Sequence, residues 1–277
     1  MFKEGFQKRI DEIILRSRQL GPNRGLGPEG KPHFGRFVQD YKNGKQILFY
    51  RYIHMLDGYD YTSNIHGLDN LERIKNEQIL VVANHPYQDP LKGGHCQRIL
   101  INHNVYNMTQ KETRWLFGGD KKSPEYLMRK RFFRQSSLIL VRDDDPQASS
   151  VLIRQAFKNK DAMGINPEGN GNKSLLKASP KAGKMIIAAA THKYNIVCIA
   201  TDFKNGKFFM AVDAPLDNMK ILGAAMQFRH DQDRLQELLA DYCMARVARL
   251  LPQEKRGYYS DFQKFIDAFE SLIVEKT

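Results

Sequence analysis

Short apolar runs alternate with segments of helical periodicity between about residues 61 and 200. Apolar runs of this length, bounded by polar residues, are typical of strands. They are Ile79–Ala83, Trp115–Phe117, Leu138–Val141, Ala162–Ile165 and Ile196–Ala200. The segments between them, at about 90–104, 146–158 and 180–193, have the spacing of helices. This alternation predicts an α/β fold with a mixed, largely parallel sheet flanked by helices.

Helical spacing of apolar residues also marks both ends of the chain. Near the amino end, basic residues flank an amphipathic pattern made by Phe2, Phe6, Ile10, Ile13 and Ile14. The pattern predicts a helix that docks on the core or lies on a membrane surface. Near the carboxyl end, we expect a helical pair over about 235–250 and 260–274. We therefore divide the chain into an N-terminal helical segment, 1–56, and one domain, 57–277.

The composition is that of a folded protein, with 277 residues of which 42% are hydrophobic and 27% charged. No apolar run reaches the roughly 18–20 residues of a membrane-spanning helix, and no signal peptide opens the chain. Cys96, Cys198 and Cys243 do not form a disulfide framework and fit a reducing compartment. We expect a cytoplasmic protein that binds peripherally to the inner face of the membrane.

Basic residues outnumber acidic ones by 43 to 31, which gives a net charge of +12. Such an excess attracts anionic partners: phosphates, nucleotides, nucleic acid or acidic lipid surfaces. A basic stretch between Lys121 and Arg134 contains two phenylalanines, and it is either a solvated face or a docking surface for lipid or a carrier protein. The chain has no recognisable nucleic-acid-binding motif, so nucleic acid is the less favoured partner.

Polar residues follow directly after the first predicted strand. Asn84 and His85 come after Ile79–Ala83, and the strand ends of α/β sheets are where ligand sites collect. Pro86 disfavours helical dihedral angles at His85, which places the histidine in the turn. Asp89 is close enough to orient the imidazole, and such a pair supplies a general base near neutral pH. The plainer interpretation is a turn histidine beside an aspartate that caps the next helix.

A second polar turn follows the strand at Ala162–Ile165. It contains Pro167, Glu168 and Gly169, and its glycine allows the backbone to approach a ligand closely. The turn is not a P-loop, because Asn170 stands where that motif needs lysine. Taken alone, the three residues also fit an ordinary turn.

Arg142 ends the strand at Leu138–Val141 and can bind a phosphate through paired hydrogen bonds. Three aspartates follow it directly, before Pro146. They are best explained as residues that cap and stabilise the start of a helix, since acidic side chains favour a helix amino end. We therefore predict no metal site here.

Together and in this order, the segments resemble the glycerolipid acyltransferase family, which includes 1-acylglycerol-3-phosphate acyltransferase. The first three family blocks are matched by Asn84-His85 with Asp89, by the strand ending in Arg142, and by Pro167-Glu168-Gly169. A fourth block is matched by the helix with Lys181-Ala182-Gly183-Lys184 and the strand Ile196–Ile199. An entry segment at His66–Leu71 and a closing segment near 248–259 extend the resemblance over roughly residues 60 to 260.

The resemblance implies transfer of a fatty acyl group from acyl-CoA or acyl carrier protein to a hydroxyl of a lysophospholipid or glycerol-phosphate-type acceptor. It gives His85 the role of general base and gives Asp89 the role of orienting it, as the acid does in a triad. The substrate-binding residues that it implies are Asn84, Arg142, Pro167, Glu168 and Gly169. No metal or redox cofactor is needed, and an anionic membrane surface is an expected partner.

The chain departs from the family pattern in two places. The histidine and aspartate of the first block are separated by three residues, where the family has four. Asn170 and Gly171 stand where the family has Thr-Arg, so an expected phosphate-binding arginine is absent, and Lys173 or Lys177 is its candidate substitute. These departures keep two alternatives open: a catalytically inactive relative that binds acyl lipids, and, less favoured, a basic nucleic-acid-binding protein.

Overall fold

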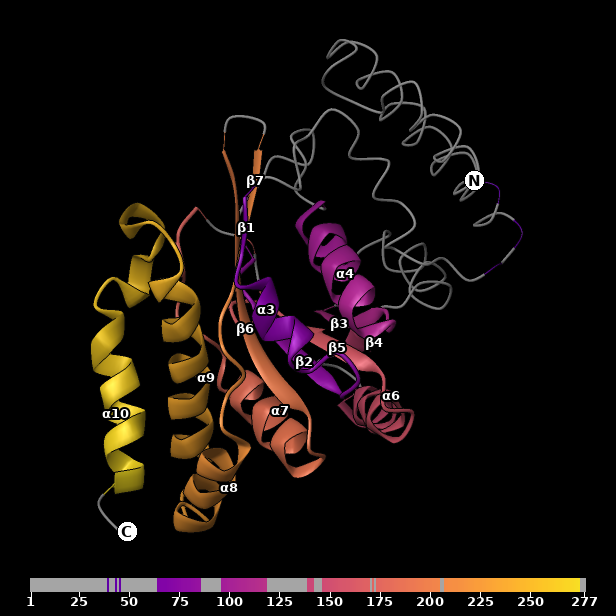
Figure 1. Ribbon diagram of the computed structural model, residues 1–277. Coiled ribbons are helices and arrows are strands. Elements are labelled where there is room, and N and C mark those ends of the chain that lie inside the picture. The colour runs from indigo at the N-terminus through magenta and orange to yellow at the C-terminus, as the bar shows by residue number, and fades with distance from the viewer. Residues whose placement is uncertain are drawn as a thin grey trace, which may run out of the picture.

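The computed structural model describes residues 64–85, 96–118, 139–141, 146–169, 171, 173–204 and 207–274, with residues 39, 43 and 45. Within these ranges the chain forms an α/β domain around a seven-stranded sheet in the order β1-β7-β6-β2-β5-β3-β4 (Figure 1). The predicted α/β class with a mixed, largely parallel sheet is confirmed. The helices predicted within 1–56 lie outside the described residues.

The strands of this sheet are β1 (Ile65–His66), β2 (Ile79–Ala83), β3 (Thr113–Gly118), β4 (Ile139–Val141), β5 (Ala162–Ile165), β6 (Asn195–Lys204) and β7 (Lys207–Val212). Neighbouring strands pair in parallel, except that β6 and β7 form an antiparallel hairpin. Strands β2 and β5 have the predicted bounds. The prediction ended β6 too early, at Ala200, because the rest of that strand is specified by its pairing with β7, which was not predicted.

The helices are α3 (Leu68–Glu72), α4 (Cys96–Thr109), α6 (Pro146–Lys158), α7 (Pro180–Thr191), α8 (Asn218–Gln227), α9 (Gln232–Arg249) and α10 (Phe262–Val274), with 3-10 turns η3 (Gln253–Lys255) and η4 (Gly257–Tyr259). Helix α6 has the predicted bounds, and α4 extends further toward the carboxyl end than predicted. The predicted C-terminal pair is confirmed as α9 and α10, which pack side by side (Figure 1). Helix α8 was missed.

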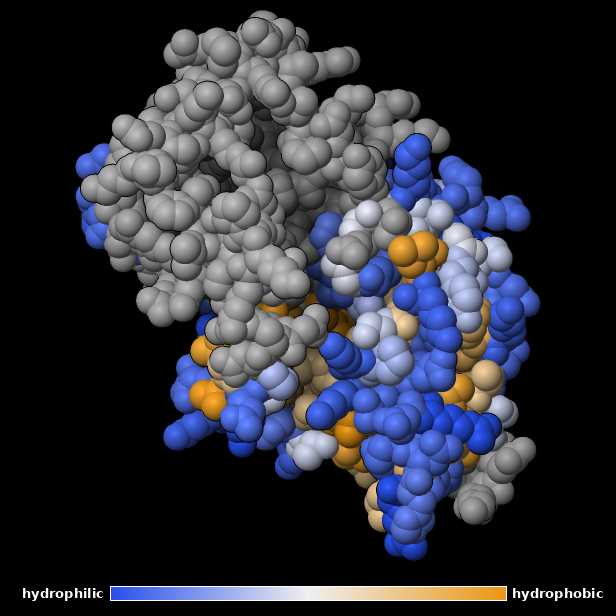
Figure 2. Space-filling model, turned by 180° about the vertical axis from the view of Figure 1, so that it is seen from behind, coloured by the Kyte–Doolittle hydropathy of each residue, from blue (hydrophilic) through white to orange (hydrophobic). Residues whose placement is uncertain are grey.

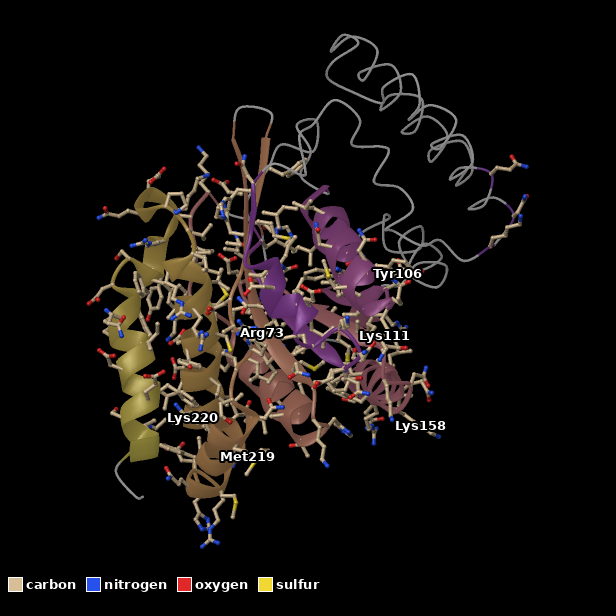
Figure 3. The ribbon with its side chains drawn as sticks, viewed as in Figure 1. Arg73, Tyr106, Lys111, Lys158, Met219 and Lys220 are labelled. Atoms are coloured by element: carbon tan, nitrogen blue, oxygen red, sulfur yellow. The ribbon has the colours of Figure 1, made fainter. Side chains whose placement is uncertain are left out.

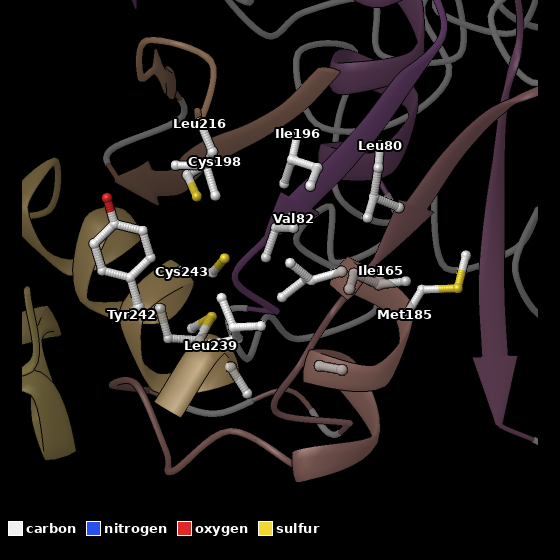
Figure 4. Packing of buried hydrophobic residues seen from close by; sticks show 14 of the residues in the cluster. Leu80, Val82, Ile165, Met185, Ile196, Cys198, Leu216, Leu239, Tyr242 and Cys243 are labelled. Atoms are coloured by element: carbon white, nitrogen blue, oxygen red, sulfur yellow. The ribbon is translucent and has the colours of Figure 1, made fainter. Parts of the chain in front are cut away.

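Both faces of the sheet are buried, as the continuous apolar strands require. Along β2, Leu80 and Val82 belong to one buried cluster, and Ile79, Val81 and Ala83 to another. Figure 4 shows the first cluster, in which β2, β5 and β6 face residues of α7 and α9. The free thiols of Cys198 and Cys243 meet there. Residues of α3 and α4 belong to the second cluster, so helices cover both faces.

The described surface is largely hydrophilic in the view of Figure 2. In the part of the chain that the structure describes, no helix has both the length and the apolar character needed to cross a membrane. Met219, a strongly exposed hydrophobic residue, lies on α8 at the end of the molecule opposite the β6–β7 hairpin (Figure 3). The two segments that we predicted to contact a membrane, the N-terminal helix and 121–134, lie outside the described residues.

Candidate functional site

The carboxyl ends of β2 and β5 meet beside the middle of β6. In the parallel register, Val82 pairs with Ile165 and Ala83 pairs with Ile199. The residues that follow each strand, together with Thr201 on β6, therefore lie at one edge of the sheet. This is the edge at which open α/β sheets place their ligands.

Asn84 joins the end of β2 to β6. Its side chain is buried, donates to the carbonyl oxygen of Thr201 at 2.8 Å and accepts from the Thr201 N–H at 2.8 Å. Asn166 links the same turn to β5, because its amide donates to the carbonyl oxygens of Ala83 at 2.9 Å and Asn84 at 3.0 Å. The side chains of Asn84 and Asn166 thus connect β2 to β6 and to the turn after β5, just beyond the last paired residues of β2. The described contacts of the Asn84 side chain are therefore structural, and the importance of Asn166 was missed.

Glu168 connects the turn that contains His85 to a second loop. One carboxylate oxygen accepts from the backbone N–H of His85 at 2.8 Å, and the other accepts from the N–H of Leu176 at 2.9 Å. Both oxygens are therefore engaged by backbone donors. We call this three-residue arrangement, His85–Glu168–Leu176, the Glu168 clasp. It brings together two motifs that are 83 residues apart in the sequence.

The Glu168 carboxyl is mostly buried, which changes its acidity. Burial disfavours the charged form and raises the pKa of Glu168 to about 7, although the two backbone N–H groups of the clasp lower it in part. The group therefore changes its charge near neutral pH. Perturbed groups of this kind gather at functional sites.

The imidazole of His85 lies against the backbone of Gly171. A β-carbon at Gly171 would be 3.1 Å from His85 Cε1 and 2.7 Å from Nδ1, and the shorter distance is one that real β-carbons essentially never show. The ring is half-buried. A glycine at position 171 therefore allows the present position of the imidazole.

The C-terminal segment forms one wall of the site. Leu175 donates its N–H to the carbonyl oxygen of Lys255 at 2.9 Å and accepts from the N–H of Tyr258 at 2.9 Å. Tyr259 is fully buried, and its hydroxyl accepts from the Ala178 N–H at 2.8 Å while donating to Asp241 at 2.6 Å. Burial raises the pKa of Tyr259, and so does the bond to Asp241. These contacts fix residues 175–178 beside the clasp.

A small cleft, with a volume of about 10 Å³, opens between these segments. That volume holds about one water molecule. The cleft is lined by Asn84, Glu168, Lys173, Ser174, Leu175, Thr201, Asp202, Leu251 and Lys255. Asp202 is buried and pairs with Lys255 at 3.2 Å. The cleft thus combines two carboxyl groups with two lysines directly beside the His85 turn.

The structure brings five of the predicted site residues to one edge. They are Asn84, His85, Pro167, Glu168 and Gly169. Pro167 is buried, its carbonyl oxygen accepts from Ser179 at 2.9 Å, and Gly169 takes the left-handed conformation at φ 74°. Asp89 and Arg142 lie outside the described residues.

Sequence analysis missed Thr201, Asp202 and Lys255 as site residues. Thr201 and Asp202 belong to the part of β6 that the prediction omitted. Lys255 follows α9, far along the chain; it lies within the closing segment of the resemblance but was not predicted to lie near His85. Only the packing of α9 against the sheet brings it there.

Among the described residues, no three His, Cys, Asp or Glu side chains gather in a way that would hold a metal ion. The donors at this edge are instead backbone N–H groups, two asparagines and two lysines. No protein-family model matches the chain, and no match was found among curated proteins.

Proposed function

We propose that the protein is an O-acyltransferase that transfers a fatty acyl group from an acyl thioester to a hydroxyl of a lysophospholipid or glycerol-phosphate-type acceptor. The observation that carries the proposal is the hydrogen bond of 2.8 Å between the His85 N–H and Glu168. It joins the two turns that resemble separate blocks of the glycerolipid acyltransferases. A half-buried histidine in the turn beside a cleft, at the strand ends of an α/β sheet, is also placed for general-base chemistry.

In the proposed reaction, the imidazole of His85 accepts the proton of the acceptor hydroxyl. The hydroxyl oxygen attacks the thioester carbonyl carbon, and the C–S bond breaks as the tetrahedral intermediate collapses. The thiolate then takes the proton from His85, which returns the base to its neutral form. One ester and one thiol are formed, and no acyl-enzyme is needed.

Lys173 is the better substitute for the absent arginine. It lines the cleft with Asn84 and Glu168, whereas Lys177 pairs with Glu237 of α9 and is absent from the cleft lining. The hydrogen bond to Glu237 raises the pKa of Lys177, so the ammonium group stays charged and paired with Glu237. We therefore assign contact with the acceptor phosphate to Lys173.

Lys173→Ala is expected to raise KM for a phosphate-bearing acceptor by about tenfold, the value of one hydrogen bond to a charged group. Turnover of an acceptor without phosphate should not change. Lys177→Ala is the matched control and should leave both constants near wild type. Initial-rate measurements with a lysophosphatidate and a monoacylglycerol make the comparison. Equal effects of the two substitutions would remove Lys173 from the assignment.

Gly171→Ala is expected to lower kcat by about ten- to a hundredfold, because a displaced base loses its alignment with the reacting atoms. The side chain of His85 can rotate away from the new methyl group, and the His85 carbonyl oxygen, at 3.3 Å, needs to shift by only a few tenths of an ångström, so the fold should tolerate the substitution. Melting temperature and kcat, measured on the same sample, separate these effects. An unchanged kcat would show that the contact with Gly171 does not position the base.

The test of the proposed function is thiol release from long-chain acyl-CoA in the presence of a panel of lysolipids, glycerol 3-phosphate and monoacylglycerol. Release that depends on the acceptor supports acyl transfer and identifies the acceptor class. Repeating the panel with acyl carrier protein distinguishes the two donors. Binding of both donors without release under any condition would favour the inactive relative.

The nucleic-acid alternative is the less favoured one. The four basic residues labelled in Figure 3, Arg73, Lys111, Lys158 and Lys220, lie on different parts of the fold. Nucleic-acid binding proteins usually gather such charges along one face. Binding to a duplex or single strand with a steep salt dependence would reverse this conclusion.

A further inference from the structure

The Glu168 clasp uses the whole carboxylate for backbone contacts. One oxygen accepts from His85 and the other from Leu176, at 2.8 and 2.9 Å. Each carboxylate oxygen thus has one backbone donor, and the carboxyl still lines the cleft. Glu168 therefore has a structural role beside the substrate-binding role that the resemblance implies.

The contact at His85 is made through the main chain, directly after β2 ends. Asn84 fixes the preceding residue through Thr201, and Gly171 lies against the imidazole. The N–H of His85 is thus the point at which Glu168 controls the position of the histidine backbone. Leu176 anchors the other end of the clasp in the loop that the C-terminal segment supports.

The titratable groups around Glu168, among the described residues, come from four segments. They are His85 after β2, Lys173 in the loop after Glu168, Asp202 on β6 and Lys255 on η3. Asp202 and Lys255 pair with each other at 3.2 Å. The charge of Glu168 is therefore set mainly by its burial and by the two N–H groups of the clasp.

We propose that Glu168 is a positioning residue whose ionised carboxylate holds the backbone of His85 to that of Leu176, so that protonation of Glu168 releases one of these contacts and lowers turnover. This inference rests on the proposed role of His85. A protonated carboxyl has one oxygen that carries hydrogen and is a poor acceptor, so it cannot serve both N–H groups equally. The site is then active with Glu168 ionised and His85 neutral.

Protonation of Glu168 is expected to lower turnover but to raise the stability of the folded protein. The pKa of Glu168 in the folded protein, about 7, is above the ordinary value of 4.5. The contribution of this group to stability is therefore complete below pH 4.5 and is lost as the pH rises through about 7. The ionised clasp is kept at a cost in stability, which is common for strained or buried groups at functional sites.

The direct test follows the backbone amides by NMR in ¹⁵N-labelled protein between pH 5 and 9. The amide of Leu176 is the main probe, because Leu176 has no ionisable side chain of its own. In wild type, the Leu176 amide is expected to titrate with a midpoint near 7, and in Glu168→Gln this titration should disappear. Glu237→Gln is the matched control and should leave it intact. A Leu176 amide that titrates equally in Glu168→Gln, or not at all in wild type, would overturn the proposal.

The second readout is the pH dependence of kcat/KM. The ratio of the wild-type kcat/KM to that of Glu168→Gln should be about tenfold at pH 8, because the amide oxygen accepts from only one of the two N–H groups. The ratio should approach one as the pH falls below the pKa of Glu168, about 7, because the protonated carboxyl then resembles the amide. A ratio that does not change with pH would contradict the positioning role. Absence of turnover in every protein would defeat the proposed function alone, since the Leu176 titration still decides on the clasp.

Discussion

Replacing His85 by alanine is expected to reduce acceptor-dependent thiol release by about 10³-fold, the typical contribution of a positioned general base. The substitution removes the imidazole and leaves the backbone of residue 85 in place. The backbone N–H at position 85, which donates to Glu168 at 2.8 Å, remains in the variant. The clasp should therefore persist, and the loss would report on the imidazole itself.

The measurement compares initial rates of wild type and His85→Ala with the acceptor found in the panel, together with urea unfolding curves of both proteins. His230→Ala is the control, since His230 is an exposed histidine that contacts Arg229 between α8 and α9. It should keep full activity. A rate for His85→Ala within about tenfold of wild type would exclude the imidazole as the base.

The largest expected loss of stability comes from Gly183→Ala. Gly183 lies in α7 where that helix crosses α9, and an added β-carbon would be 1.9 Å from the carbonyl oxygen of Gln236. The obstacle is backbone, so no side-chain rotation can relieve it and the two helices must separate. Forcing atoms into a well-packed contact costs about 3 kcal/mol of unfolding free energy, which corresponds to a melting temperature lower by about 6–12 °C.

Gly223→Ala provides a control of opposite sign. Gly223 lies in the interior of α8, and a β-carbon there would meet nothing within 4 Å. Alanine stabilises a helix interior by about 0.8 kcal/mol relative to glycine, so the melting temperature should rise by about 2 °C. Differential scanning calorimetry of the two variants checks both values. A small effect of Gly183→Ala would show that the added methyl group fits between α7 and the Gln236 backbone of α9.

Sequence analysis located those elements whose own residues carry the signal. Strands β2 and β5 are short apolar runs that end at polar turns, and α6 begins at a proline after acidic residues, so the bounds of all three were predicted. Strand β7 and the end of β6 were missed; they form an antiparallel hairpin, and β7 also pairs with β1. Helix α8 is short and contains Gly223, which weakens its helical pattern.

The residues of the candidate site also fall into those that the sequence predicted and those that it missed. Asn84, His85 and Glu168 were found because each follows an apolar strand, and polar residues at such positions are recognisable without a structure. The order of those turns also carried the resemblance to the acyltransferases. Asp202 also comes just after a predicted apolar strand, so the same signal could have found it. Lys255 was not found, because it meets Asp202 only across the fold, at 3.2 Å.

The sequence by itself determined the alternation of strands and helices, the buried faces and the turns that carry polar residues, since side-chain periodicity reports burial directly. Tertiary structure alone decided what those turns do. It placed β2 between β5 and β6, so that the N–H of His85 meets Glu168, and it brought η3 to the cleft through α9. Hydrogen bonds between residues 83 positions apart depend on strand order, and strand order follows from the packing of the whole sheet rather than from any local pattern.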